Sequence, residues 1–329
     1  MSDIEKIMGM AIADISKVLG VDKANLARVQ GADIPAGVGD KGVFGGGYNK
    51  KDVIDYIIIS STGNAVDRDD LSVARHSLAS TSNGVSDRGV FGGGNDGSYS
   101  SVIDYIVISS TGNAVDRDTL TLARSYLAAT SNGVSDRGVF GGGYTGLLSN
   151  VIDYIVISST GNAVDRNNLT VERYALAGTS NGVSDRGVFG GGTSASPSNI
   201  IDYIVISSTG NAVDRNNLTL ARYGLAATSN GVSDRGVFGG GFTGLYQNVI
   251  DYIVISSTGN AGDRNDLTVK RRYLAATSNG VSDRGVFGGG STGSDSNVID
   301  YIVISSTGNA VDRDDLSVAR YGLAGTSNA

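Results

Sequence analysis

The residue types that most often do chemistry in proteins are scarce in this chain. Its 329 residues include no cysteine and a single histidine, His76. Zinc and copper sites depend on Cys and His ligands, so the sequence disfavours both metals. We interpret His76 as an incidental surface residue. Without a His/Cys constellation, we expect no catalytic residue, no bound metal, no cofactor and no enzyme activity.

Carboxylate and amide side chains are the second candidate for chemistry. An Asp-Arg pair followed by two residues of the Asp, Asn or Thr type recurs six times, first at Asp67–Asp70. Such oxygen ligands suit Ca²⁺, but these stretches lack the glycine-centred loop of known calcium motifs. We interpret them as a polar outer strand and turn, and calcium binding stays open as the alternative.

The third candidate is a set of arginines and aspartates that recur once per copy of the same sequence unit. Residues repeated in every copy are expected to maintain the scaffold, through Arg–carboxylate or Arg–carbonyl bonds that link neighbouring units. A ring of six arginines that binds an anion is the alternative. The arginines are Arg75, Arg124, Arg173, Arg222, Arg271 and Arg320, and the aspartates are Asp55, Asp104, Asp153, Asp202, Asp251 and Asp300.

These candidates belong to one repeated unit that covers most of the chain. The string Asp-Arg-Gly-Val-Phe-Gly-Gly-Gly recurs six times, with Lys41 for Arg in the first copy. The Ile-Asp-Tyr aspartates follow one another at strict intervals of 49 residues, the signature of a repeat architecture. The glycines stand at fixed positions of the repeat, so they indicate turns and close packing rather than a disordered tract.

Each copy predicts four short β-strands. In the fourth copy, turn signals at Asn181–Gly182 and Thr209–Asn211 divide the unit, and the Ile-Asp-Tyr segment is rich in β-branched and aromatic residues. No segment keeps a helical period over about ten residues. Four strands joined by tight turns are typical of a β-propeller blade, and a β-solenoid is the competing all-β interpretation. The strands expected in this copy are residues 173–180, 187–192, 200–207 and 212–215.

The two ends of the repeat region predict how a ring closes. The first copy begins near Gly37, already at its second strand, and the last copy ends with a lone first strand at residues 320–329. Together these fragments complete one blade, and a closed ring has no open sheet edges. We predict an all-β fold: a six-bladed β-propeller over residues 37–329, closed by the C-terminal strand, with a short N-terminal arm over residues 1–36.

The repeat unit resembles the kelch repeat. The matching residues of the fourth copy are Arg173, the Val188–Gly191 segment that ends in Gly-Gly, and the Ile201–Tyr203 triplet. The unit departs from that family on the outer strand, where Val213 stands in place of the usual Trp. The sequence motif of the repeat, IDYI followed by STGNA, is also similar to motifs in kelch-like repeat proteins of tailed phages, especially marine ones. This resemblance implies a kelch-like propeller and a virion structural protein.

The N-terminal arm carries a smaller repeat. Lys6–Gly9, Lys17–Gly20 and Arg28–Gly31 share the order basic, apolar, any residue, glycine, at intervals of eleven residues. The arm is either three short helices ended by glycine or short strands with glycine turns. It cannot bury its apolar face alone, so we expect it to anchor on a neighbouring subunit, with packing on the propeller as the alternative. The anchoring residues are Ile7, Met8, Ile12, Ile15, Val18, Leu19, Leu26 and Val29.

The copies differ most in two places, the stretch between Gly-Gly-Gly and Ile-Asp-Tyr and the residues just after the repeated Arg. In a four-stranded meander both places lie on the same face, and loops on a rigid scaffold often carry binding sites. Aromatic residues gather there, which suits protein or glycan contacts, while drift in unconstrained loops is the alternative. The predicted binding residues are Tyr48, Tyr99, Tyr126, Tyr144, Leu147, Leu148, Tyr174, Tyr223, Phe242, Leu245, Tyr246 and Tyr321.

Charge and hydropathy disfavour nucleic acid and the membrane interior as partners of this protein. The net charge is −7 and the charges are interspersed, which disfavours nucleic-acid binding. No apolar stretch is long enough to cross a bilayer, and acidic residues stand where a signal peptide is basic.

We therefore expect a non-enzymatic virion structural protein, made in the host cytoplasm, that forms part of a capsid decoration, a tail or a fibre. The arm would bind other virion proteins in a multimeric assembly, and the variable loops would bind a host-surface protein or glycan during host attachment. An intracellular kelch-type protein-interaction scaffold and a glycan-binding, lectin-like propeller are the alternatives.

Overall fold

The computed structural model describes the propeller part of the chain. The chain divides into two units, Met1–Val38 and Gly39–Ala329. The predicted arm, with all its anchoring residues, lies outside the described residues. The described residues are 40–49, 51–83, 87–132, 135–181, 184–230, 233–278 and 283–327.

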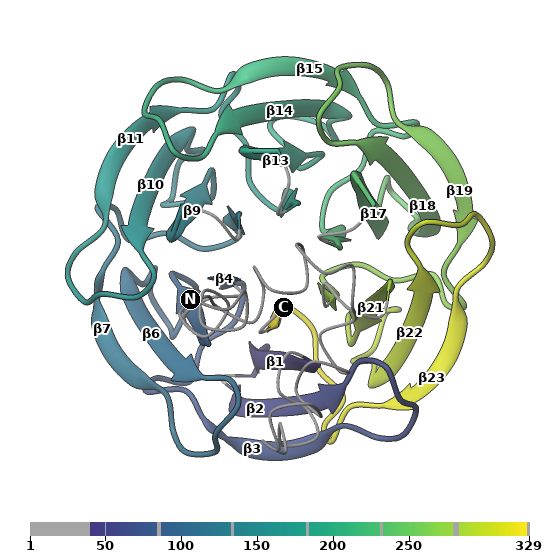
Figure 1. Cartoon of the computed structure of the whole chain (residues 1–329), viewed down its shortest axis with the longest axis horizontal. Helices are drawn as coiled ribbons and strands as arrows, with labels where there is room; N and C mark the ends of the chain where they lie inside the picture. Colours follow the sequence, from purple (N-terminus) through teal and green to yellow (C-terminus); the bar gives the residue numbers. More distant parts are fainter. Residues whose placement is uncertain are drawn as a thin grey trace, which may run out of the picture. The chain divides into compact units, whose positions relative to one another are not determined.

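Six antiparallel sheets of four strands each stand around a common axis as the blades of a propeller (Figure 1). Within the described ranges, every regular element is a strand. The fold class predicted from the sequence is therefore confirmed. From inner to outer strand, blade 1 is β24 (Ala324–Ser327), β1 (Lys41–Gly47), β2 (Lys51–Ile58) and β3 (Val66–Asp70); blade 2 is β4 (Ala79–Asn83), β5 (Arg88–Gly92), β6 (Val102–Val107) and β7 (Val115–Thr119); blade 3 is β8 (Ala128–Ser131), β9 (Arg137–Gly141), β10 (Val151–Val156) and β11 (Val164–Asn168); blade 4 is β12 (Ala177–Ser180), β13 (Arg186–Gly190), β14 (Ile200–Val205) and β15 (Val213–Asn217); blade 5 is β16 (Ala226–Ser229), β17 (Arg235–Phe242), β18 (Tyr246–Val254) and β19 (Gly262–Asp266); blade 6 is β20 (Ala275–Ser278), β21 (Arg284–Gly288), β22 (Val298–Val303) and β23 (Val311–Asp315).

The first and last strands of the propeller close the ring. β24 pairs antiparallel with β1, so that Gly42 lies opposite Ser327 and Gly45 lies opposite Ala324. Blade 1 therefore takes its inner strand from one end of the sequence and its other three strands from the other end. This is the closure that the sequence predicts, and it is confirmed.

The inner strand is shorter than the sequence predicts. In blade 4 the expected strand begins at Arg173, whereas β12 begins at Ala177. Ala175 adopts a left-handed backbone conformation with a φ of 54°, which is incompatible with a continuous strand. Residues 173–176 thus belong to the connection that enters the blade. The sequence hides this turn because an alanine stands at the left-handed position.

The hydrophobic core lies between the blades rather than within one of them. Val90 of blade 2 and Phe140 of blade 3, for example, belong to one buried cluster. A Cβ atom on Gly92, the first glycine of its triplet, would lie 2.7 Å from the ring of Phe140. Gly93, the second glycine, has a φ of 68°. The triplet therefore serves close packing and a turn, as predicted.

Each repeated arginine forms a buried ion pair with the aspartate of Ile-Asp-Tyr. The Arg173 guanidinium lies 2.9 Å from Asp202, and neither side chain has exposed surface. Thr170, in the connection that enters the blade, donates its N–H and its hydroxyl to the same carboxylate. The expected Arg–carboxylate pair is confirmed. The two side chains serve one blade, so the ion pair itself does not link neighbouring blades. The arginine links them through its backbone, which is bonded to the preceding blade. The pairs are Arg75–Asp104, Arg124–Asp153, Arg173–Asp202, Arg222–Asp251, Arg271–Asp300 and Arg320–Asp55.

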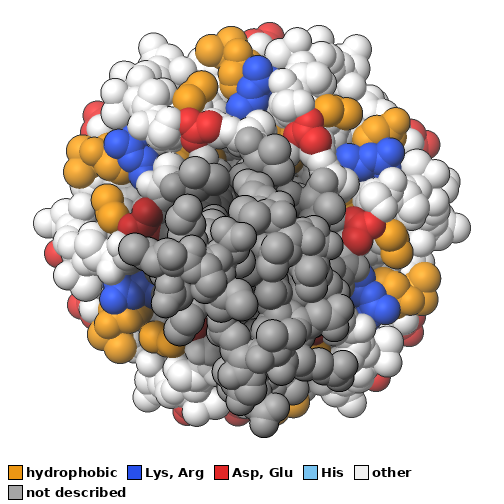
Figure 2. Space-filling model, viewed as in Figure 1, with side chains coloured by type: hydrophobic (Ala, Val, Ile, Leu, Met, Phe, Trp, Pro, Cys, Tyr) orange, Lys and Arg blue, Asp and Glu red, His pale blue; other side chains and the backbone are white. Residues whose placement is uncertain are grey.

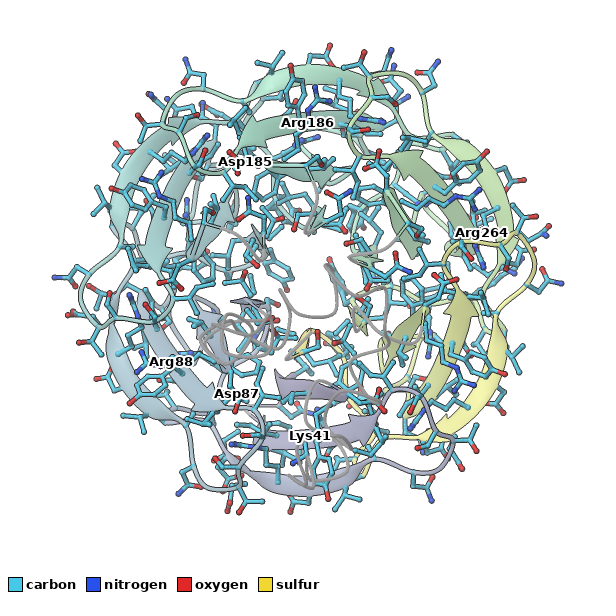
Figure 3. All side chains as sticks on the ribbon, viewed as in Figure 1. Lys41, Asp87, Arg88, Asp185, Arg186 and Arg264 are labelled. Atoms are coloured by element: carbon cyan, nitrogen blue, oxygen red, sulfur yellow. The ribbon has the colours of Figure 1, made fainter. Side chains whose placement is uncertain are left out.

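Two other contacts link neighbouring blades. The third glycine of each triplet donates its N–H to the carbonyl of the next repeated arginine, as Gly192 does to Arg222 at 2.9 Å. Farther out, the arginine of each Asp-Arg stretch donates to three backbone carbonyls of the next blade. Arg264 of β19, in blade 5 (Figure 3), donates to the carbonyls of Val303, Ser306 and Gly308 in blade 6. Arg264 is only 2% exposed. The stretch forms the outer strand of each blade, as the sequence predicts, but its arginine is buried.

Deletion of residues 320–329 is expected to lower the melting temperature strongly. Blade 1 then loses β24, and Asp55 loses its ion-pair partner Arg320. The unpaired buried carboxylate alone costs about 3–5 kcal/mol. Thermal unfolding followed by circular dichroism measures the effect, with deletion of residues 328 and 329 as the control. A truncated protein that melts like the full chain would refute closure by β24.

The substitution Asp202→Ala is expected to destabilise the protein by about 3–5 kcal/mol, because it leaves Arg173 buried without its carboxylate. The double variant Arg173→Met with Asp202→Leu removes both charges, so we expect it to be more stable than the single variant. Urea unfolding compares the two. If the double variant is no more stable, the unpaired charge is not the cause of the loss.

Candidate functional site

The variable loops and the connections between blades meet at one end of the propeller. In blades 2 to 6, the residue after the repeated arginine forms a β-bridge with the residue after the glycine triplet. Tyr174 pairs in this way with Thr193, and Tyr223 with Phe242. The two variable places of the repeat therefore lie on the same face, as the sequence predicts.

A continuous network of aromatic rings lies across this end. Neighbouring ring centroids are 4.6–6.4 Å apart, a range in which aromatic pairs attract each other. All the aromatic residues predicted for binding belong to the network. We call the surface the aromatic face; its rings are Tyr48, His76, Tyr99, Tyr126, Tyr144, Tyr174, Tyr223, Phe242, Tyr246, Tyr273 and Tyr321.

Two tyrosines of the aromatic face meet over the propeller axis. Tyr126 and Tyr273 enter blades 3 and 6, on opposite sides of the ring, yet their ring centroids are 5.5 Å apart. Both have a φ of 55°, a left-handed conformation that costs a residue other than glycine about 1–3 kcal/mol. Backbone hydrogen bonds hold this geometry, since Tyr126 donates to Ser77 and Tyr273 donates to Gly224. The same bond recurs between all six connections and closes a ring.

Two loops of the aromatic face carry a leucine at the tip. The blade 3 loop, residues 144–148, and the blade 5 loop, residues 242–246, share the order aromatic-Thr-Gly-Leu. Leu147 and Leu245 are 77% and 74% exposed, the highest values among the large hydrophobic side chains of the described residues. The blade 4 loop between them, residues 193–197, consists of small residues. The aromatic face is therefore uneven: the loops of blades 3 and 5 each expose a leucine, and the blade 4 loop between them has only small side chains.

A pocket of about 590 Å³ opens beside the blade 3 loop. Its volume is in the range of sites that hold a small ligand or side chains of a partner. The cavity on the propeller axis, by contrast, has a volume of about 70 Å³. The larger pocket is lined by Tyr126, Tyr144, Gly146, Leu147, Leu148, Tyr174, Ser194 and Tyr273.

One cation lies inside the aromatic network. The guanidinium carbon of Arg272 is 4.4 Å from the ring centroid of Phe242 and 5.0 Å from that of Tyr273. The rings of Tyr246 and Tyr223 lie 5.5 and 6.0 Å away. All four distances suit cation–π attraction. Nη1 of Arg272 also donates to the Tyr223 hydroxyl at 3.2 Å.

Three titratable groups of the aromatic face are neutral at pH 7, and burial shifts the pKa of each further toward the neutral form. Burial raises the pKa of Tyr273, and together with the neighbouring Tyr48 it raises the pKa of Tyr321 to about 12. Burial also lowers the pKa of His76 below its usual value of 6.5, so this imidazole is neutral at pH 7. These groups therefore add no charge to the aromatic face at pH 7.

Three residues of this surface were not among the predicted binding residues. His76 is not an incidental surface residue, because it is half-buried between the rings of Tyr48 and Tyr126. Arg272 and Tyr273 were left out although they follow a repeated arginine. The signal for Tyr273 was its position, which is the same position in the repeat as that of Tyr126.

The other end of each second strand carries an acidic and a basic residue side by side, as Asp185 and Arg186 show at the start of β13 (Figure 3). Asp185 accepts from the N–H and hydroxyl of Ser207. Arg186 donates to carbonyls of the next blade and lies over the ring of Tyr203. On the face drawn in Figure 2, acidic, basic and hydrophobic side chains recur around the ring. These repeated charges serve the scaffold.

Membrane-spanning helices and metal-binding clusters are two further features to consider in the described ranges. No helix there has the length and apolar character needed to cross a membrane. The same residues bring together no group of three or more His, Asp or Glu side chains suited to a metal ion.

Comparison with known proteins gives no family. No family model matches the chain, and no curated protein matches it. The likeness to kelch and phage repeats therefore rests on the residues of the repeat, whereas the six-bladed propeller is a property of the structure.

The free energy of unfolding is expected to fall as the pH is lowered from 7 to 5. Because burial holds the pKa of folded His76 below the unfolded value of about 6.5, the unfolded chain takes up a proton first. The stability is fully present above that value and is lost as the pH falls toward the folded pKa.

The variant His76→Tyr, which introduces the residue found at Tyr174 and Tyr321, is expected to remove this part of the pH dependence. Urea unfolding at several pH values compares the two proteins. The same loss of stability in the variant would contradict the assignment to His76.

Proposed function

We propose that the protein is a non-enzymatic interaction scaffold whose aromatic face binds a partner protein. The observation that carries this proposal is the aromatic network in which Tyr126 and Tyr273 meet over the axis, together with the exposed Leu147 and Leu245. The left-handed backbone at the two tyrosines belongs to the scaffold, because it recurs at the equivalent positions Ser77, Ala175, Gly224 and Gly322. What differs between the blades is the side chain that this position presents, and two large aromatic side chains there favour a role in binding.

The composition of the face supports a protein partner. Tyrosine and arginine are enriched among the residues that dominate protein interfaces, and exposed leucines such as Leu147 and Leu245 provide apolar contacts. The rings are already held by one another and by the scaffold. Little side-chain freedom is then lost on binding, which favours affinity.

We also propose a setting for this scaffold, a virion structural protein of a capsid decoration, a tail or a fibre. The likeness of the repeat to kelch-like repeats of tailed phages supports it. In that setting residues 1–36 anchor the protein to other virion proteins, and the aromatic face meets a host-surface protein. Mass spectrometry of purified phage particles tests whether they contain this protein. Its presence is expected, and absence of the protein from the particles would favour an intracellular kelch-type scaffold.

A glycan-binding, lectin-like propeller is the second candidate function. The pocket beside Leu147 favours it, because four of its lining residues are tyrosines, whose rings offer an apolar face and a polar hydroxyl. A glycan array probed with the full-length protein separates this candidate from the first.

Exchange of both leucine-bearing loops is expected to abolish partner binding and to leave the fold intact. Residues 144–149 and 242–247 are each replaced by Ser-Thr-Gly-Ser-Asp-Ser, the sequence of residues 291–296, which the same scaffold already carries in blade 6. The exchange removes Tyr144, Phe242 and the two exposed leucines together. Cross-linking with mass spectrometry, particle assembly and adsorption to host cells are the measurements.

The matched control changes the opposite end of the propeller. Ser208→Ala alters an exposed turn between β14 and β15 and should affect none of these measurements. A loop-exchange variant that keeps the melting temperature and loses the cross-linked partner supports the proposal. If partner, assembly and adsorption are all retained, the aromatic face is not the binding surface.

A further inference from the structure

Arg272 differs from the other arginines in the described part of the chain. Each of the others donates to a backbone carbonyl or pairs with a carboxylate of the scaffold. Among the described residues Arg272 has neither kind of partner; its one side-chain hydrogen bond goes to the Tyr223 hydroxyl. The scaffold therefore gives no reason for a cation at this position.

The repeat itself sets Arg272 apart. At the equivalent position the other copies carry His76, Ser125, Tyr174, Tyr223 and Tyr321. A tyrosine there is compatible with the fold, so the arginine is not needed for blade 6 to form.

The surroundings of Arg272 prepare it to bind an anion. Four aromatic rings at 4.4–6.0 Å restrict its motion and reduce its hydration. The guanidinium group presents several N–H donors in one plane, which matches the two oxygens of a carboxylate. Burial raises the pKa of the neighbouring Tyr273, so this phenol is neutral at pH 7 and does not compensate the positive charge of Arg272.

The apolar surroundings indicate which anion fits. The blade 5 loop supplies two of the four rings, Phe242 and Tyr246, and between them the exposed Leu245. A carboxylate that reaches Arg272 therefore meets the same loop that carries the exposed Leu245. A polypeptide segment with an acidic residue next to apolar residues meets both requirements.

We propose that Arg272 binds the carboxylate of an Asp or Glu side chain in a partner protein, while apolar residues of the same segment contact Leu245. This inference rests on the proposed function, because it identifies the chemistry of the segment that the aromatic face receives.

A displayed library of random peptides tests the proposal, with full-length protein as the target. Peptides selected on the wild type are expected to carry Asp or Glu beside Leu, Ile or Phe. Selection on Arg272→Tyr, which places the residue of Tyr174, Tyr223 and Tyr321 in blade 6, is expected to lose the acidic preference. The loop-exchange variant described above is expected to select no peptide from the library.

Calorimetry then measures the pairing itself. For a selected peptide, replacement of Glu by Gln or of Asp by Asn is expected to weaken binding to the wild type about tenfold. The same replacement should leave binding to Arg272→Tyr unchanged, because the charge it pairs with is absent. Thermal unfolding of Arg272→Tyr verifies that the variant is folded.

The outcomes separate this inference from the proposed function. If selected peptides depend on the loops but show no acidic preference, or keep it with Arg272→Tyr, the inference fails and the proposed function stands. If the wild type selects no peptides, both fail. Arginine-dependent binding of acidic sugars on a glycan array, without peptide binding, also overturns both and favours the lectin-like candidate.

Discussion

The packing of each blade against the next is the constraint on which the rest of this structure depends. The core clusters lie between blades, so a blade is covered on both sides only when the ring is closed. Phe44 of blade 1 lies on Gly288 of blade 6, just as Phe140 lies on Gly92. The pairing of β24 with β1 therefore does more than complete one sheet, because it provides blade 6 with its neighbour.

Closure also determines what the charged side chains do. Bringing inner strands and connections together buries backbone carbonyls and carboxylates, which need partners because buried polar groups without hydrogen bonds are costly. Arg173 and Asp202 satisfy each other inside one blade, while Arg264 satisfies carbonyls across the gap to the next. The repeated charges are thereby bound within the scaffold. Residues that do not recur, such as Arg272, remain for other roles.

Much of the fold could be predicted from the sequence. The spacing of Ile-Asp-Tyr indicates a repeat architecture, the turn signals divide each repeat into four strands, and the split first blade indicates a closed ring. The pairing of Arg173 with a carboxylate was also expected. The carbonyl partners of Arg264 could not be predicted, because they depend on how neighbouring blades are set around the axis, which the period of the repeat does not reveal. For the candidate site, the position of the aromatic loops followed from the strand order. Tyr273 was missed because only the structure shows that its position is left-handed and turned over the axis. Gly224 and Gly322 at the same repeat position were the available signal.

The aromatic face breaks the symmetry of the ring for a steric reason. Six large side chains cannot all meet over one narrow axis, and a Cβ atom on Gly224 would lie 3.1 Å from the Tyr273 ring. Two tyrosines on opposite sides of the ring are compatible with small neighbours such as Gly224 and Gly322. Once the centre holds only Tyr126 and Tyr273, the six blades no longer present equivalent surroundings. A partner then meets a different surface at each blade, which favours one bound orientation over six.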